Sequence, residues 1–323
     1  MKTYRLTLRP LTAFGTPLAG DTLFGQLCWA LRHRLGNAAL TALLDGYTAG
    51  RPFAVLSDGL PAGHLPLPML PSRLWAASDL DRKALKRRRW LPLDALAAPL
   101  AGWQGLARSD ADAAQALGGP PGATLHTERA QPHNTLSRQT GSTGTGAFAP
   151  YSQPQIWYAS GVHFHVYAVL DETRLPLAEL LAALTQIGHT GFGRDASTGL
   201  GKFDLVGEPL ADPFAARGPR QAWLTLGPCA PQGQGYCPRR SYYQPLTRFG
   251  RHGDIAVHAA SPFKRPVLLA RAGGLFVPLQ PHTPPGFIGQ GLGGSAAPVS
   301  PAMPETVHQG YAPVVGLDLP ENR

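Results

Sequence analysis

The chain opens with a strict alternation of polar and apolar residues. Over residues 3–9 the apolar side is formed by Tyr4, Leu6 and Leu8, and this period of two predicts a strand with one buried face. Leucines then recur every fourth residue at positions 23, 27, 31 and 35, which places them on one face of a helix. Asp21 is suited to cap this helix and Gly36 to end it.

A short helix over residues 39–44 and a strand over residues 53–57 follow, so the chain begins with a strand–helix–strand unit. A similar unit returns later. Residues 162–170 alternate again, with His163, His165 and Tyr167 opposite the apolar side. Pro176 suits the first turn of an amphipathic helix that Gly188 can close, and a strand is expected over residues 201–206.

Further strands are predicted over residues 221–226 and in a hairpin formed by residues 267–270 and 275–277 around a pair of glycines. Long Gly- and Pro-rich loops are expected over residues 58–75, 118–155 and 278–304. We therefore predict an α+β chain with two ferredoxin-like (RRM-like) domains, residues 1–155 and 156–323.

Composition excludes several classes of protein. The chain has 323 residues, of which 43% are hydrophobic, so it is too apolar to be disordered and long enough to bury a core. With 38 glycines and 33 prolines it is unsuited to a helical bundle. It holds no apolar run of membrane-spanning length and no signal-peptide pattern, so we expect a cytoplasmic protein without membrane contact. None of its three cysteines forms a CxxC pair, and no disulfide, metal or cofactor is expected.

The net charge is +9, and residues 1–155 hold 16 of the 29 basic but only 9 of the 20 acidic residues. Six of the eight residues in 82–89 are basic. An anionic partner such as nucleic acid is one explanation. Composition drift is the other, because arginine outnumbers lysine 24 to 5, as a GC-rich genome favours. For residues 82–89 the plain alternative is a solvated helix face.

Glycines recur in residues 188–203, where 191–196 match a loose dinucleotide-binding pattern. That pattern requires a strand before it and a helix after it, and here the order is reversed. Residues 289–294 match GxGxxG but lead into no helix, and Gly201-Lys202 is followed by Phe203, so a P-loop is excluded too. The glycines either let backbone N–H groups approach a phosphate or form a purely structural connection.

The segment GFGRDASTGLGKF at 191–203, after an amphipathic helix, resembles the Gly-rich loop of the RAMP superfamily of CRISPR proteins. Residues 14–30, FGTPLAGDTLFGQLCWA, together with 56–61 and 67–71, resemble more specifically the RAMP subunit that caps the crRNA 5′ handle in type III-A effector complexes. HNTLSRQTG at 133–141, FAP at 148–150 and Gly310-Tyr311-Ala312 fit the same subunit.

This resemblance implies two RRM-like domains, no catalytic duty and binding of the crRNA 5′ handle. It also implies contacts with the large Cas polymerase-type subunit and with the adjacent backbone RAMP subunit. Residues 133–150 would form the inserted hairpin or thumb that touches the guide RNA.

Single-stranded RNA is held by cations on its phosphates, by stacking and by hydrogen bonds. Three segments supply candidate RNA-binding residues: Asn134, Arg138, Thr140 and Thr143 in the inserted segment; Gly191, Gly193, Arg194, Ser197, Thr198, Gly199, Gly201 and Lys202 in the Gly-rich loop; and Gly289 and Gly291 near the C-terminus.

An enzyme is the alternative. Some RAMP relatives are endoribonucleases that process the crRNA precursor by general acid–base catalysis, often with histidine. Candidates here are His163 and His165 on one strand, or His126 and His133 in the loop. The HxH pair also has a spacing that a metal accepts, but no HExxH accompanies it, and a solvent- or RNA-facing strand surface is the simpler interpretation.

Overall fold

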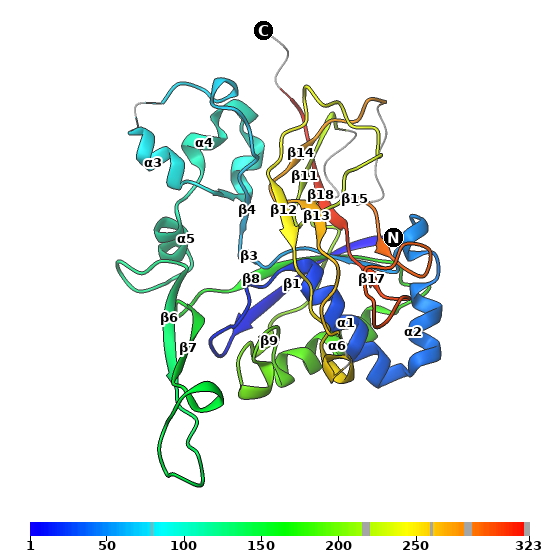
Figure 1. The fold of residues 1–323 in the computed structure, drawn as a ribbon. Helices are drawn as coiled ribbons and strands as arrows, with labels where there is room; N and C mark the ends of the chain where they lie inside the picture. Colours follow the sequence, from blue (N-terminus) through cyan, green and yellow to red (C-terminus); the bar gives the residue numbers. More distant parts are fainter. Residues whose placement is uncertain (79, 215–219, 259–260, 281–285, 320–323) are drawn as a thin grey trace.

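The computed structural model describes residues 1–78, 80–214, 220–258, 261–280 and 286–319. It is built around two larger antiparallel sheets and a long insertion (Figure 1), with two-stranded sheets beside them. The first sheet has the strand order β10-β1-β8-β2, with β9 also paired to β1 and β3 to β8. Its strands are β1 (Lys2–Pro10), β2 (Ala54–Leu56), β3 (Leu60–Pro61), β8 (Phe164–Leu170), β9 (Phe203–Leu205) and β10 (Leu210–Ala211).

The helices α1 (Gly20–Leu35) and α6 (Leu177–Thr190) cover one face of this sheet (Figure 1). They bury their apolar stripes against the apolar side of β1, in a core that joins Leu6, Leu27 and Leu184. The short helix α2 (Asn37–Leu44) follows α1. The four-strand order β10-β1-β8-β2 at the centre of this six-stranded sheet, with two helices on one face, is the ferredoxin-like arrangement.

The strand predicted to open a second domain belongs to this first sheet. β8 pairs with β1 along its length, with Lys2 opposite Leu170 and Leu8 opposite Phe164, and it pairs with β2 on its other edge. The strand–helix–strand unit around residues 162–206 therefore completes the first module, because alternation identifies a strand but not its partner. We propose that the two modules divide between β10 and β11 rather than near residue 155.

The second sheet has the order β14-β11-β18-β15, formed by β11 (Ala222–Thr225), β14 (Leu275–Phe276), β15 (Phe287–Gly289) and β18 (Tyr311–Leu317). In the described ranges every α-helix lies between residues 20 and 190. The second sheet therefore has no α-helix of its own module packed on it, and other parts of the chain bury its face. Leu65, Leu91 and Trp103 of the insertion share a core with Leu224 and Val315 of this sheet.

The structure differs from two of the predictions, one of a hairpin and one of a loop. Residues 267–270 and 275–276 do not pair with each other: β13 (Val267–Ala270) pairs with β12 (Pro245–Arg248), whereas β14 pairs with β11. The loop predicted over residues 278–304 contains β15 and β16 (Leu292–Gly293), and β16 pairs with β17 (Val307–His308). Residues 281–285 of that loop lie outside the described residues.

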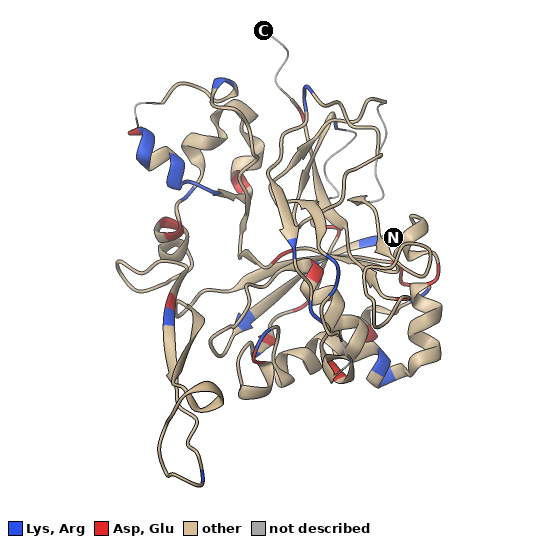
Figure 2. Ribbon diagram, viewed as in Figure 1, with Lys and Arg blue, Asp and Glu red and all other residues tan. Residues whose placement is uncertain are grey.

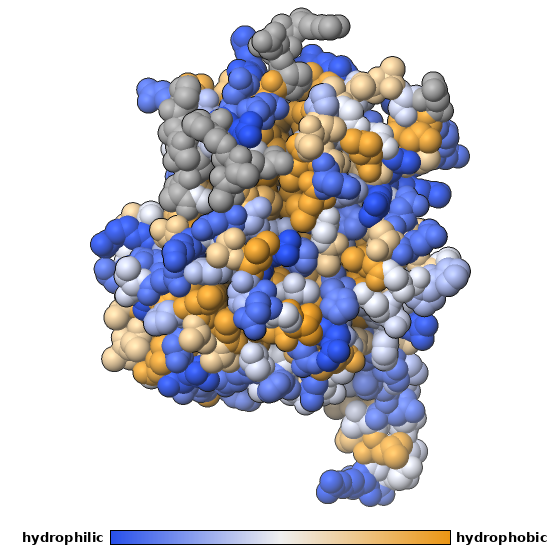
Figure 3. Space-filling model, turned by 180° about the vertical axis from the view of Figure 1, so that it is seen from behind, coloured by the Kyte–Doolittle hydropathy of each residue, from blue (hydrophilic) through white to orange (hydrophobic). Residues whose placement is uncertain are grey.

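The insertion separates β3 from β8. It contains the small pair β4 (His64–Pro66) and β5 (Trp90–Pro92), the helices α3 (Arg82–Arg87), α4 (Trp103–Leu106) and α5 (Asp110–Ala116), and the hairpin of β6 (His126–His133) and β7 (Tyr151–Tyr158). This hairpin projects from the body as a long arm, seen also from behind (Figures 1 and 3). The expectation of an α+β chain with an inserted hairpin is confirmed. Among the described residues no helix is long and apolar enough to cross a membrane.

Candidate RNA-binding surface

The Gly-rich loop that follows α6 is fastened to the connection between β1 and α1. Gln26 of α1 bridges the loop, because its Nε2 donates to the carbonyl oxygen of Gly191 at 3.2 Å and its Oε1 accepts the N–H of Gly193 at 3.0 Å. Thr16 Oγ1 accepts the N–H of Arg194 at 3.0 Å. The loop is therefore held in place before any ligand binds.

Close packing explains most of the glycines in this loop. Gly191 and Gly201 have φ angles of 107° and 74°, which favour glycine, and a Cβ atom on Gly201 would lie 2.1 Å from the carbonyl oxygen of Phe192. The N–H of Gly201 donates to Ala13 and that of Lys202 to Thr12 Oγ1. The N–H groups of this part of the loop thus donate to acceptors within the protein. Here the glycines form a structural connection and leave no N–H group for a phosphate.

The outer part of the loop is open to solvent. Ser197 and Thr198 are exposed, and Gly199 has a φ of 93° with no neighbour near the position of a Cβ atom. The Thr198 hydroxyl donates to the carbonyl oxygen of Asp195 at 2.8 Å. Residues 195–199 therefore form the part of the predicted loop that a ligand can reach.

The Gly-rich loop meets the base of the inserted hairpin at Arg194. Its guanidinium donates to the carbonyl oxygen of Pro154 in β7 at 2.7 Å and pairs with Asp195 at 3.1 Å. Nearby, Phe14 and Ile156 form a backbone bridge between the β1–α1 connection and β7. Two of the three predicted segments, the hairpin and the Gly-rich loop, are thereby joined into one surface.

The tip of the hairpin carries Asn134, Arg138, Thr140 and Thr143, all exposed. No carboxylate of the described residues pairs with Arg138, and this residue lies in the segment that joins β6 to β7. A free guanidinium on a projecting arm suits a phosphate ligand.

The hairpin also presents aromatic rings that were not among the predicted residues. Tyr151 and Trp157 on β7 are 48% and 43% exposed, and the Tyr151 ring stacks on His133 with centroids 5.2 Å apart. Exposed rings of this kind are platforms on which RNA bases stack. Their even spacing along the strand was the available signal, because it places both on one face.

The third predicted segment lies elsewhere. Gly289 is in β15 of the second sheet, and its Cβ position is 2.2 Å from the carbonyl oxygen of Gly310. Gly291 is buried, and a Cβ atom there would lie 2.5 Å from the carbonyl oxygen of Tyr47. Gly289 allows close packing within the second module, Gly291 allows close packing between the two modules, and neither extends the surface around the hairpin.

The histidines proposed for catalysis do not gather at an open site. His165 is 7% exposed, its Nδ1 accepts the N–H of Gly63 at 3.2 Å, and burial lowers its pKa to about 4. The strand face predicted to meet solvent or RNA is therefore covered at His165 and at Tyr167, where the second module and the insertion pack on it, whereas His163 is only half-buried. His126 and His133 lie at opposite ends of β6.

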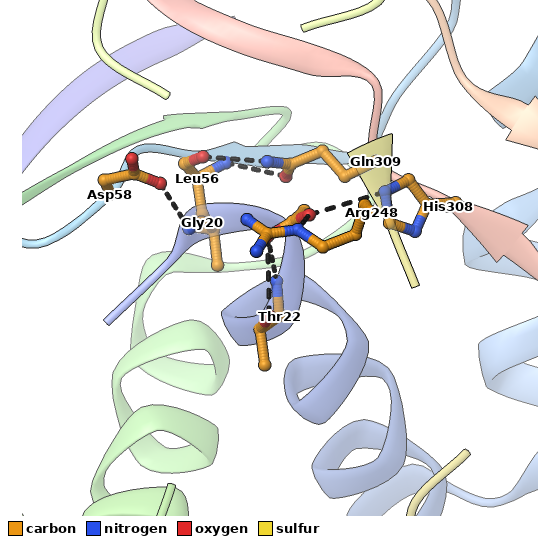
Figure 4. Close-up of polar contacts among 8 residues, drawn as sticks. Gly20, Thr22, Leu56, Asp58, Arg248, His308 and Gln309 are labelled. Atoms are coloured by element: carbon orange, nitrogen blue, oxygen red, sulfur yellow. Dashed lines mark hydrogen bonds and ion pairs between the residues drawn. The ribbon is translucent and has the colours of Figure 1, made fainter. Parts of the chain in front are cut away.

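A buried polar network lies at the start of α1, and Figure 4 shows its contacts. Asp21 was predicted to cap this helix, but Ala19 holds that position, and Asp21 instead pairs with Arg248 of β12 through contacts of 2.6 and 3.0 Å. Burial opposes ionisation of Asp21, yet His308 and the charge of Arg248 lower its pKa to about 2. The contact joins the first module to the second.

Asp58 lies beside this pair, and its pKa is shifted in the opposite direction. Its Oδ1 accepts the N–H of Gly20 at 2.8 Å, while burial and the neighbouring charge of Asp21 raise its pKa to about 7. Gln309 completes the network by exchanging two hydrogen bonds with the backbone of Leu56. Within the described part of the chain no group of three or more His, Cys, Asp or Glu residues is placed to hold a metal ion.

The geometry is that of a RAMP-like fold: a ferredoxin-like sheet, a Gly-rich loop after its second helix, a second sheet and an inserted hairpin. No protein-family model matches the sequence, and no curated protein matches it significantly.

Solved structures narrow the fold to that of Csm4. The chain is similar to Csm4 in the Csm3–Csm4 subcomplex of the type III-A CRISPR–Cas interference complex, with a TM-score of 0.61 and 14% identity over 98% of this chain and 99% of the other. It is also similar to Csm4 in the Csm1–Csm4 cassette in complex with cA4 (TM-score 0.58, 16% identity) and with pppApA (0.56, 15%), each covering 100% of both chains. The chain thus has a Csm4-like RAMP fold throughout its length.

Proposed function

We propose that this protein is a non-catalytic, crRNA-binding subunit of a type III-A CRISPR interference complex. In that role it caps the 5′ handle of the guide RNA and docks both the large polymerase-type subunit and the adjacent backbone RAMP subunit. The observation that carries the proposal is the Csm4-like fold over the full chain, in structures where Csm4 is paired with Csm1 or with Csm3.

The composite surface supports the RNA-binding part of the proposal. The hairpin provides an unpaired cation at Arg138 and exposed rings at Tyr151 and Trp157, while the adjoining loop provides the hydroxyl groups of Ser197 and Thr198. Together these groups offer the charge, stacking and hydrogen bonds by which single-stranded RNA is held.

The histidine arrangement gives no support to the endoribonuclease alternative. A general base must reach its substrate proton, and His165 is covered, with its Nδ1 occupied by the N–H of Gly63. Incubation of labelled repeat RNA with the protein tests this alternative directly. Cleavage that disappears in His163→Ala/His165→Ala would overturn the non-catalytic assignment.

Binding of RNA that carries a 5′ handle, compared with a scrambled RNA of equal length, tests the proposal. We expect the handle RNA to bind at least tenfold more tightly. Arg138→Glu should weaken binding and reduce the salt slope, because one RNA phosphate is no longer neutralised by the protein. Arg239→Glu in the second module is the matched control, since it makes the same charge change at an exposed site.

Replacing residues 134–150 by an Asn-Gly turn tests the hairpin as a unit, because such a turn closes two antiparallel strands. The β6–β7 ladder and the body should remain folded, and the preference for handle RNA should fall. Equal binding of handle and scrambled RNA by the unmodified protein and its complex would contradict the proposal. Arg194→Gln is a less direct test, because it also breaks the hydrogen bond to Pro154.

A further inference from the structure

The basic run at 82–89 divides into two sets of side chains. Arg88 and Arg89 are used within the insertion: Arg88 Nη1 donates to the carbonyl oxygen of Ala107 at 2.9 Å, and Arg89 Nε donates to Asp110 Oδ1 at 2.7 Å. These contacts hold the end of α3 against residues 105–110.

The other four cations have no such role. Arg82, Lys83, Lys86 and Arg87 are all exposed, and no carboxylate of the described residues forms an ion pair with any of them. At about 100° per residue they occupy an arc of about 140° on the helix, while Leu85 lies outside that arc and is half-buried. The result is one continuous cationic face on α3, a helix whose ribbon is largely blue in Figure 2.

Helix stability accounts for at most half of this face, because Lys86 and Arg87 lie in the last turn, where the helix dipole favours cations. Arg82 and Lys83 lie in the first turn, which has no acidic residue and where the helix dipole disfavours cations. Arg82 and Lys86, and Lys83 and Arg87, are like-charged pairs four residues apart, which destabilise a helix. Asp81 caps the helix through the N–H of Lys83, but it does not neutralise the face.

We propose that this α3 face binds the sugar–phosphate backbone of single-stranded RNA, without preference for base. The centre of a protein–protein interface is enriched in apolar and aromatic residues, and the arc carries none. A polyanion backbone, in contrast, needs only accessible cations. The α3 face and the RNA-binding hairpin belong to one insertion and lie along the same edge of the molecule (Figure 1). The inference does not depend on recognition of the handle.

Fluorescence anisotropy with a labelled oligouridine of about 20 nucleotides tests this face in the full-length protein. The variant Arg82→Gln/Lys83→Gln/Lys86→Gln/Arg87→Gln should bind about tenfold or more weakly near 0.1 M salt. Its slope of log affinity against log salt should fall by about 0.7 for each phosphate that the protein no longer neutralises. Arg82→Lys/Arg87→Lys should keep both values, because the charge is retained.

The matched control removes four exposed arginine charges from the second module, as Arg239→Gln/Arg251→Gln/Arg265→Gln/Arg271→Gln. It should leave oligouridine binding near the wild-type value, and circular dichroism should show every variant folded. An unchanged slope in the α3 variant, or an equal loss of affinity in the control, would overturn the proposal. Loss of polyglutamate binding with oligouridine binding intact would indicate an acidic protein partner instead.

The two RNA proposals can fail separately. Loss of the α3 charges should weaken handle RNA and scrambled RNA by the same factor, so the ratio of their affinities stays constant. If the wild-type protein binds handle RNA and scrambled RNA with nearly equal affinity, the handle-capping proposal is contradicted and the proposal for the α3 face is unaffected.

Discussion

Two neighbouring carboxyl groups at the start of α1 titrate in opposite directions, and this follows from their partners. Asp21 has a bidentate contact with Arg248, whereas Asp58 accepts only the neutral N–H of Gly20 and feels the like charge of Asp21 more strongly than the opposite charge of Arg248. Burial disfavours the charged form of both groups. The opposite charge of Arg248, with His308, overcomes burial at Asp21, and nothing comparable does so at Asp58.

Asp58→Asn tests this contrast. The folded-state pKa of Asp58, about 7, lies above its ordinary value of 3.8. Its stabilising contribution is therefore complete below about pH 4 and lost as the pH rises through about 7. The asparagine keeps the acceptor for Gly20 and removes the charge, so the variant should be more stable than wild type by about 4 kcal/mol at pH 8 and equal to it near pH 4. Urea unfolding at both pH values measures this difference, and parallel pH profiles would contradict it.

Asp21→Asn should act in the other direction. The folded-state pKa of Asp21, about 2, lies below the ordinary 3.8, so its contribution is present above about pH 4 and lost as the pH falls through about 2. Removing the carboxylate leaves Arg248 without its partner, and we expect a loss of about 2–3 kcal/mol at pH 7. Asp45→Asn is the control, because the Asp45–Arg51 pair is exposed, and it should cost less than about 1 kcal/mol. Equal effects of the two changes would show that Asp21 is not a lock between the modules.

At the scale of elements, hydrophobic periodicity predicted the helices and the longer strands of the first module with small errors at their ends. It did not predict the two-residue strands β3, which falls in the loop expected over residues 58–75, and β10. The leucine spacing predicted α1, and Gly36 does end it, with a φ of 90°. The pattern did not show that residues 126–133 and 151–158 pair, because polar residues on both faces leave no alternation to detect. Only the family resemblance predicted a hairpin there.

In the Gly-rich loop the sequence pattern identified the motif, but it did not distinguish glycines that bind phosphate from glycines that allow close packing. Gly201→Ala should destabilise the protein by about 3 kcal/mol or more, because the φ of 74° is unfavourable and the new Cβ would clash with the Phe192 carbonyl oxygen. Gly199→Ala should cost only about 1–2 kcal/mol, since its φ of 93° is strained but its surroundings are open. Thermal or urea unfolding of the two variants measures the difference. Similar losses of stability would mean that packing does not explain the glycine at 201.

At the scale of the whole molecule, what the sequence could not show is which strands pair across the insertion. The residues between β3 and β8 form an excursion of about a hundred positions, and no local pattern indicates that the chain returns to the same sheet. For the same reason the sequence did not predict the burial of His165 and Tyr167. The groups that cover them come from distant segments, the insertion and the second module. Local periodicity is reliable only where the covering element is local.

Fragments of the chain distinguish the predicted division near residue 155 from the one that the strand pairing favours. A fragment of residues 1–155 lacks β8, the strand that pairs with β1, β2 and β3, so we expect it to remain unfolded by circular dichroism. A fragment of residues 1–211 keeps the complete first sheet but exposes Leu60 and Tyr167, which the second module covers in the full chain. It should form secondary structure, bind a hydrophobic dye and melt over a broad range. The full chain should melt in a single transition, because the shared core and the Asp21–Arg248 pair couple the modules. A cooperative transition in the 1–155 fragment would show that β8 is not needed to complete the first module and would restore the boundary at residue 155.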